Sequence, residues 1–226
     1  MRRFVTVCIA AMSLTGCGGL DLGKGLADLS LLSNLTADDG TARGIQTLSL
    51  FDGDISLRGP DGYCIDRSAS RTDTGFVVVA ACARVSDAEL LPSLDGFLTY
   101  QVGEPDTAIV NGSESSLADL METEAGQALL AQSGLAEDVE IIETQFISER
   151  VFVRFTDTSA PDIEGMDASM WRAFLDVNNR LVTINLRPIT GTDMSSWQGK
   201  SLIQSAADVL SDANRAESVL ETIPES

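Results

Sequence analysis

Histidine, the side chain that most often serves as a general acid or base, is missing from this chain, and Lys24 and Lys200 are its only lysines. The absence of histidine excludes Ser-His-Asp and Cys-His catalysis, histidine-ligated zinc and an imidazole general base. Carboxylates are plentiful, with 34 Asp and Glu residues, but abundance alone identifies no site. The sequence therefore predicts no catalytic residue, no metal site and no cofactor. A carboxylate-based hydrolase is the last of three functional hypotheses that the sequence leaves open.

The segment Gly199-Lys200-Ser201 imitates the end of a phosphate-binding loop. Met194 stands where the first glycine of such a loop is needed, and the segment falls inside an expected helix instead of opening one after a strand. Trp197 occupies the serine position of a Ser-x-x-Lys motif. We therefore expect neither phosphate binding nor Ser-Lys hydrolysis at this lysine.

Two short segments carry alternating oxygen donors of the kind that bind calcium. They are Asp52-Gly53-Asp54 and Asp176-Val177-Asn178-Asn179. Neither continues into a calcium loop with its glycine and distal glutamate. Because hairpin turns account for every residue in both segments, we predict turns there.

Cysteine chemistry begins near the N-terminus, where Met1-Arg2-Arg3 precedes an apolar run from Phe4 to Leu14. The run is too short to span about 30 Å of hydrocarbon and is typical of a removed export signal. Leu14-Thr15-Gly16-Cys17 resembles the lipobox of bacterial lipoproteins. The resemblance implies that residues 1–16 are a signal peptide. It also implies that Cys17 is lipidated, so that acyl chains such as palmitate anchor the protein in a membrane.

The residue after the lipobox cysteine helps to predict which bacterial membrane holds the lipoprotein. In the lipoprotein family, an aspartate at this position often retains the protein in the inner membrane. Here the residue is Gly18. The resemblance therefore implies the periplasmic face of the bacterial outer membrane, with the inner membrane as the less favoured alternative.

The lipobox assigns Cys8 to the signal and Cys17 to lipid, which leaves Cys64 and Cys82 as a pair in an oxidising compartment. A turn signal at residues 72–75 lies midway between them, so a hairpin there would set the two cysteines opposite each other. We predict a disulfide. A redox or metal pair is the weaker alternative, because the chain has neither Cys-x-x-Cys nor histidine.

The chain is strongly acidic, with 34 Asp and Glu residues against 15 Lys and Arg and a net charge of −19. Such a field repels phosphate backbones, so we exclude nucleic acid as a partner. For the charge itself, we favour solubility of an exported protein over recognition of a basic partner.

The chain divides into a tether, a globular body and a tail. Residues 17–44 form the expected lipidated tether, with room for a short helix marked by leucines 22, 26 and 29. These leucines are compatible with contact to the membrane, to a partner or to the body. Residues 45–215 are the expected globular domain, and residues 216–226 are an expected flexible acidic tail.

Strand patterns dominate the globular part. The expected strands are Thr47–Phe51, Asp54–Arg58, Tyr63–Ile65, Gly75–Arg84, Phe97–Val102, Val139–Phe146, Arg150–Thr156, Trp171–Val177 and Arg180–Arg187. The Gly75–Arg84 run is nearly continuous in apolar residues, which is typical of a strand buried on both faces. Asn178-Asn179 tolerates positive φ and joins the last two strands in an antiparallel hairpin.

Two segments have helical periodicity. One runs from Ser115-Ser116 to Gly134, and the other begins at Ser195-Ser196 and places Trp197 to Leu210 along one apolar stripe. Both tryptophans, Trp171 and Trp197, fall at core-like positions. The predicted fold class is α+β: a single domain in which two main helices cover an antiparallel β-sheet.

The body also resembles a known fold. The run Ile55 to Asp66, the central helix, and the segment Trp171 to Ile184 followed by a tryptophan-bearing final helix are similar to the Mog1/PsbP-like fold. The resemblance implies a sheet sandwiched between helices. It transfers no functional residue to this chain.

The leading functional hypothesis is a membrane-anchored periplasmic lipoprotein that acts as a non-catalytic interaction or scaffold module for another envelope protein. The alternative is a lipoprotein that holds a small apolar or lipid-like ligand between sheet and helix, with the strand Phe76 to Ala81 lining the pocket.

Overall fold

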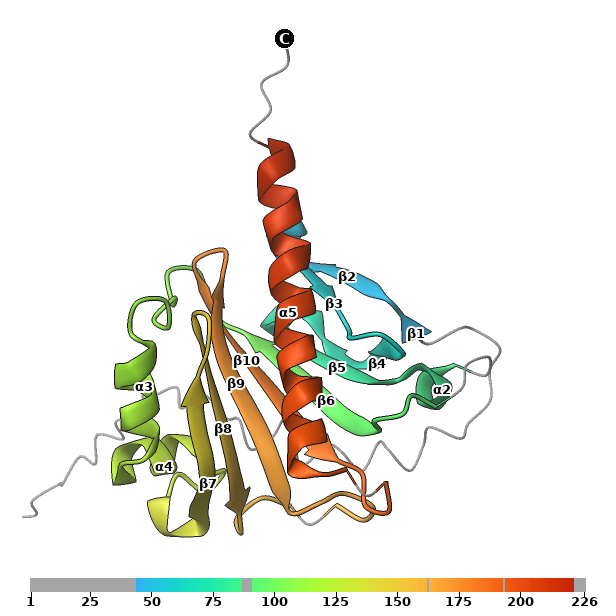
Figure 1. Cartoon of the computed structure of the whole chain (residues 1–226). Helices are drawn as coiled ribbons and strands as arrows, with labels where there is room; N and C mark the ends of the chain where they lie inside the picture. Colours follow the sequence, from blue (N-terminus) through green and yellow to red (C-terminus); the bar gives the residue numbers. More distant parts are fainter. Residues whose placement is uncertain (1–43, 87–90, 162, 193, 222–226) are drawn as a thin grey trace, which may run out of the picture.

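Apolar residues on alternate positions favour extended backbone in several segments, and the strands assemble into one large antiparallel sheet (Figure 1). The computed structural model describes residues 44–86, 91–161, 163–192 and 194–221. The sheet has eight strands in the order β1-β4-β5-β6-β10-β9-β8-β7. Its strands are β1 (Gly44–Ile45), β4 (Tyr63–Arg71), β5 (Phe76–Ala81), β6 (Gly96–Val102), β7 (Val139–Phe146), β8 (Arg150–Asp157), β9 (Ser169–Val177) and β10 (Arg180–Pro188). A separate antiparallel pair, β2 (Thr47–Leu50) and β3 (Ile55–Arg58), completes the strands. The predicted α+β class with an antiparallel sheet is confirmed.

The β9–β10 hairpin forms where the sequence predicts it. Val177 pairs with Arg180 across a two-residue turn. The turn residues Asn178 and Asn179 have φ of 46° and 62°, a conformation that asparagine adopts at little cost. The hairpin places β9 and β10 at the centre of the sheet, between β6 and β8.

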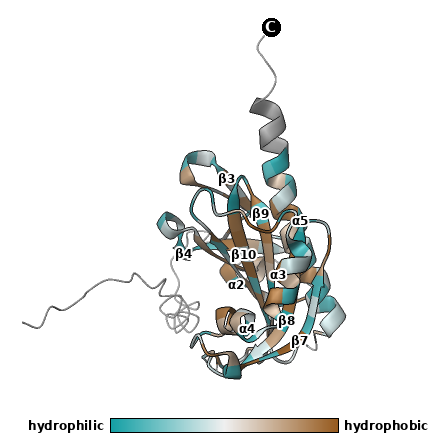
Figure 2. Ribbon diagram, turned by 90° about the vertical axis from the view of Figure 1, so that its left-hand side faces the viewer, coloured by the Kyte–Doolittle hydropathy of each residue, from teal (hydrophilic) through white to brown (hydrophobic). Residues whose placement is uncertain are grey.

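Helices cover both faces of the sheet (Figures 1 and 2). The long helix α5 (Ser196–Glu221) packs on one face, and its buried stripe is Leu202, Ile203, Ala206, Ala207 and Leu210. On the other face, α3 (Glu114–Met121) and α4 (Glu124–Leu130) pack over β7 and β8. Strand periodicity divides β8 between the two cores: Phe152 belongs to the α5 side, and Val151 and Val153 belong to the α3–α4 side.

The expected helix from residue 115 to 134 is two short helices. Helix α3 ends at Met121, and Thr123 starts α4 by accepting a hydrogen bond from the Gly126 N–H at 3.2 Å. The break turns the apolar stripe out of register, so Leu120 and Leu129 are exposed by 38% and 67%. The prediction of one continuous helix was wrong because a threonine inside an apolar repeat also serves as an N-cap.

The two tryptophans have opposite environments. Trp171 on β9 is buried at 2% exposure, as predicted, whereas Trp197 in the first turn of α5 is 74% exposed. The core-like position assigned to Trp197 was wrong. The face of α5 that packs on the sheet contains Gly199, Leu202, Ile203, Ala206 and Leu210, and Trp197 lies on the opposite side of the helix.

Several boundaries differ from the predicted ones. Strand β5 ends at Ala81, and a short helix α2 (Cys82–Val85) replaces the end of the expected strand. The backbone of α5 continues to Glu221, beyond the expected end of the globular domain at residue 215. The signal peptide, Cys17 and the tether to residue 43 lie outside the described residues.

Short 3-10 turns connect the described elements: η2 (Phe51–Gly53), η3 (Thr72–Thr74) and η4 (Ala136–Asp138). Among the helices of the described ranges, none combines the length and the apolar character needed to cross a bilayer.

Candidate interaction surface

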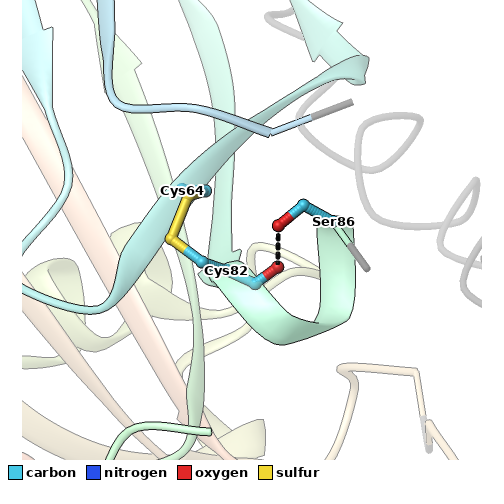
Figure 3. The surroundings of a disulfide bond; sticks show 3 residues. All are labelled: Cys64, Cys82 and Ser86. Carbon is cyan, nitrogen blue, oxygen red and sulfur yellow. Dashed lines mark hydrogen bonds between the residues drawn. A yellow bond between two sulfur atoms is a disulfide. The ribbon is translucent and has the colours of Figure 1, made fainter. Parts of the chain in front are cut away.

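Cys64 and Cys82 form the predicted disulfide, with their Cα atoms 4.7 Å apart (Figure 3). The surrounding hairpin is less symmetrical than expected. A bulge between Asp66 and Arg71 shifts the β4–β5 register, so Cys64 pairs with Ala80 and Cys82 lies just beyond the strand, at the start of α2. Both cysteines are buried, at 6% and 5% exposure, which limits thiol exchange and suits a structural bridge.

Hydrogen bonds from Ser86 to Cys82 close the turn of α2 beside the disulfide. Ser86 donates from its backbone N–H and from Oγ to the Cys82 carbonyl, at 2.8 and 2.9 Å (Figure 3). Arg84 forms an ion pair with the buried carboxylate of Asp95, and this hydrogen bond raises the pKa of the guanidinium. Hydrogen bonds and an ion pair therefore hold the segment around the disulfide in place.

The phosphate-loop imitation lies inside α5, as expected, and packing accounts for its residues. A Cβ on Gly199 would lie 2.9 Å from Nε1 of Trp171, so this glycine allows the helix to approach the buried ring. Lys200 Nζ forms an ion pair with Oε1 of Glu143 on β7, at 2.8 Å. The lysine thus connects α5 to the far edge of the sheet.

In the two acidic turns, oxygen atoms of Asp176 and Asp54 accept hydrogen bonds from other residues of the fold. Asp176 accepts hydrogen bonds from the backbone N–H groups of residues 109, 110 and 111, at 2.7–3.0 Å. Asp54 accepts from Arg180 Nε at 2.7 Å, and its backbone carbonyl accepts from Asn178 Nδ2 at 2.6 Å. Within the described ranges, no group of three His, Cys, Asp or Glu residues is arranged to hold a metal ion.

A shallow polar depression of about 400 Å³ lies between the β7–β8 turn, the end of β9 and α5. Its acidic lining residues are Glu149 and Asp176, and Asp176 is already engaged by the three backbone N–H groups. Arg150 of the lining forms an ion pair with Asp208 of α5. The depression therefore offers no pair of free carboxylates for acid and base roles.

The strand Phe76–Ala81, considered as one wall of a ligand pocket, is packed on both faces. Val77 and Val79 lie in the core that contains residues of β2, β3 and α5, while Val78 and Ala80 pack beside the disulfide. A ligand between this strand and α5 would have to displace side chains that are already in contact.

Strand β7 presents the most exposed apolar surface on the sheet. It is the edge strand and, in the part of the chain that the structure describes, it is hydrogen-bonded to β8 alone. Ile142, Phe146 and the following Ile147 are exposed by 46%, 53% and 45%. We call this strand with its three exposed side chains the β7 edge.

The register shows which backbone groups point out of the sheet. Ile147 N–H donates to the Arg150 carbonyl at 3.0 Å, so these two residues form a hydrogen-bonded pair. Such pairs alternate with non-hydrogen-bonded pairs along an antiparallel ladder. Phe146 and Thr144, which lie opposite Val151 and Val153, therefore direct their N–H and C=O groups away from β8.

Two side-chain atoms of β7 lack hydrogen-bond partners in the described part of the chain. Thr144 Oγ1 and Gln145 Nε2 are buried and have no hydrogen-bond partner among the described residues. Buried polar atoms without partners are rare in folded proteins and cost about 1–3 kcal/mol each. The β7 edge therefore combines outward backbone groups with buried side-chain atoms that have no partner among the described residues.

Sequence reasoning found the strand but not its role. The predicted bounds of β7, Val139–Phe146, are those of the structure. Its edge position depends on strand order, for which the local pattern carries no signal. The adjacent isoleucines Ile141-Ile142 break strict alternation, and the structure places the register shift between Ile141 and Glu143, with Ile141 packed against the α3–α4 core and Ile142 exposed.

Comparison with known proteins adds fold neighbours only. No protein-family model matches the sequence, and no curated protein matches it significantly. A variant of protein Mog1 is 11% identical with a TM-score of 0.38, covering 75% of this chain and 90% of that chain. The Saccharomyces cerevisiae Ran-binding protein Mog1p is 10% identical with a TM-score of 0.38, covering 76% and 91%.

The extracellular domain of PknH from Mycobacterium tuberculosis is 12% identical with a TM-score of 0.31, covering 85% of this chain and 94% of that chain. At these TM-scores the neighbours carry no argument about what this chain does.

Proposed function

We propose that this chain is a lipid-anchored lipoprotein of the bacterial outer membrane, facing the periplasm, and that it acts there as a non-catalytic interaction module. Acyl chains on Cys17 would hold it at the membrane, since two or three chains anchor a protein far more firmly than one. The observation that carries the interaction role is the β7 edge, a strand that pairs on one side only among the described residues and carries three exposed apolar side chains.

The remaining features support this assignment. A buried disulfide suits an oxidising compartment such as the periplasm. The carboxylates and the lysine that sequence patterns singled out are engaged in turns and ion pairs instead of facing one another in a cleft. The proposed module therefore works through its surface, and its anchor concentrates that surface at the membrane.

The anchor is tested by labelling growing cells with radioactive palmitate. We expect label in the wild-type chain and in Cys8→Ser, which is the matched control, and none in Cys17→Ser. If Cys17→Ser were labelled as strongly as the wild type, the anchor assignment would be wrong. Membrane fractionation tests the location: Gly18→Asp should move the protein from the outer to the inner membrane.

The interaction role is tested by crosslinking in native membranes and identifying the captured polypeptides by mass spectrometry. We expect a discrete partner in the wild type and in Cys8→Ser, and its loss in Cys17→Ser. Absence of any captured polypeptide in all three would refute the interaction role, whatever the palmitate result.

A further inference from the structure

We propose that the β7 edge accepts an extended, basic segment of a partner protein as a ninth strand of the sheet. The inference rests on the proposed interaction function and adds to it the docking surface and the chemistry of the partner. It follows from three properties of the edge: its backbone groups, its side chains and the charge around it.

The backbone supplies the first argument. The outward N–H and C=O groups of Thr144 and Phe146 are spaced as in any antiparallel strand, so an incoming strand can pair with both residues. The opposite end of the sheet offers much less, because β1 spans only Gly44–Ile45. Edge strands of eight residues are normally blocked by proline, by inward-facing charges or by a covering element. The sequence of β7 contains no proline or lysine, and its bulge and its two glutamates lie before Thr144, so the stretch from Thr144 to Phe146 is uncharged and pairs regularly with β8. Within the described ranges, β7 has no hydrogen-bonded neighbour on its outer side.

The side chains supply the second argument. Ile142 and Phe146 are about half exposed on the strand itself, and Ile147 extends the apolar surface into the turn. Added strands gain affinity from main-chain hydrogen bonds and specificity from contacts with alternate side chains. These three residues provide apolar contacts along the length of such a strand.

Charge identifies the partner. Between Arg84 and Arg150 the chain contains no lysine or arginine. The elements beside the edge, α3, α4, η4 and β7, are acidic throughout. Their acidic residues are Glu114, Asp119, Glu122, Glu124, Glu137, Asp138, Glu140 and Glu143. Lys200 from α5 forms an ion pair with Glu143, and Arg154 of β8 lies opposite Glu143 in the sheet. Arg150, at the β7–β8 turn, is paired with Asp208. The acidic residues outnumber these cations, so the net field around the edge is negative and attracts a basic segment.

The same charge disfavours the other occupants of a free edge. A second copy would set this acidic flank against itself, and like charges across a strand pair are destabilising. An anionic lipid surface and nucleic acid would be repelled in the same way. A basic polypeptide in extended form is the occupant that matches both the hydrogen bonding and the charge.

The probe is a ten-residue peptide of alternating valine and lysine, compared with a valine–glutamate peptide of the same length. Each is added to the full chain carrying Cys17→Ser, and binding is followed by amide NMR shifts and hydrogen exchange. We expect the lysine peptide to slow exchange of the Thr144 and Phe146 amides and the glutamate peptide to bind at least tenfold more weakly. Failure of the lysine peptide to protect these two amides would overturn the proposal.

Variants test the geometry. Thr144→Pro removes an outward N–H that β8 does not use, so the fold should persist while affinity for the lysine peptide falls at least tenfold. Phe146→Ser removes an exposed side chain and should weaken binding several-fold. Leu91→Ser is the matched control, since it removes a similarly exposed apolar side chain elsewhere, and should leave binding unchanged. Equal binding by all three variants would exclude the β7 edge.

Two further outcomes separate this inference from the proposed function. If membrane crosslinking captures a partner equally well in Thr144→Pro, the interaction module stands and the strand-addition mode is wrong. If sedimentation of the protein alone shows a dimer that Thr144→Pro abolishes, the edge accepts a second copy and the basic partner is wrong.

Discussion

Asn214 offers the sharpest test of how the long helix holds the sheets together. Its side chain is 3% exposed and connects α5 to β3 across 158 positions of sequence. Oδ1 accepts the Ser56 N–H at 2.9 Å, and Nδ2 donates to the Ser56 carbonyl at 2.9 Å and to the Leu210 carbonyl at 2.7 Å. The side-chain amide of Asn214 thus pairs with both backbone groups of Ser56, as a neighbouring strand would.

The expected effect follows from the groups that would lose partners. Asn214→Ala leaves the buried N–H and C=O of Ser56 unpaired, at about 1–3 kcal/mol each. Partial entry of water lowers the total, so we expect a loss of about 3 kcal/mol in the free energy of unfolding. Asn214→Leu keeps most of the side-chain volume but not the hydrogen bonds, and should lose about 2 kcal/mol or more.

The assay is urea unfolding of the Cys17→Ser chain, followed by far-UV circular dichroism and by tryptophan fluorescence. Trp171 lies in the core beneath α5 and should report the loss of packing. Asp212→Ala is the matched control, because Asp212 and its ion-pair partner are both exposed by about 70%. It should change stability by less than about 1 kcal/mol. Losses below 1 kcal/mol in both Asn214 variants would refute the reasoning.

Three further predictions concern other parts of the fold. Cys64→Ala with Cys82→Ala opens a bridge that spans 18 positions and should lower the free energy of unfolding by about 3 kcal/mol in urea titration; a loss under 1 kcal/mol would contradict this. Burial raises the pKa of Tyr63 and Tyr100, the only tyrosines, above the ordinary value of about 10, so the folded state keeps two protons that the unfolded chain releases. Stability should therefore hold up to about pH 10 and fall above it, and absorbance at 295 nm should rise only with unfolding; an earlier rise would show an exposed phenol. A Cβ on Gly126 would lie 2.0 Å from the Leu120 carbonyl oxygen, so Gly126→Ala should lower the thermal midpoint through a loss of about 2–3 kcal/mol, and an unchanged midpoint would count against the tight α3–α4 turn.

The sequence alone determined the features that depend on neighbouring residues. Alternation and the Asn178-Asn179 turn identified the β9–β10 hairpin, because pleating and turn geometry act within a few residues. The turn between Cys64 and Cys82 brought the cysteines near enough to pair, even though a bulge shifted the register. The acidic charge was likewise a property of composition.

Tertiary structure decided what depends on distant neighbours. Whether β7 lies at the edge or the centre depends on strand order, and its own alternation is the same in either place. Trp197 lies two residues before Gly199, which approaches the buried Trp171, so its side chain is on the opposite side of α5 from the sheet. Asn214 has the polar side chain of a solvent-facing helix position, and only the approach of Ser56, far away in sequence, makes it a buried link. Local patterns set which face of an element is apolar, but the assembly sets which apolar faces remain exposed and which polar groups find partners.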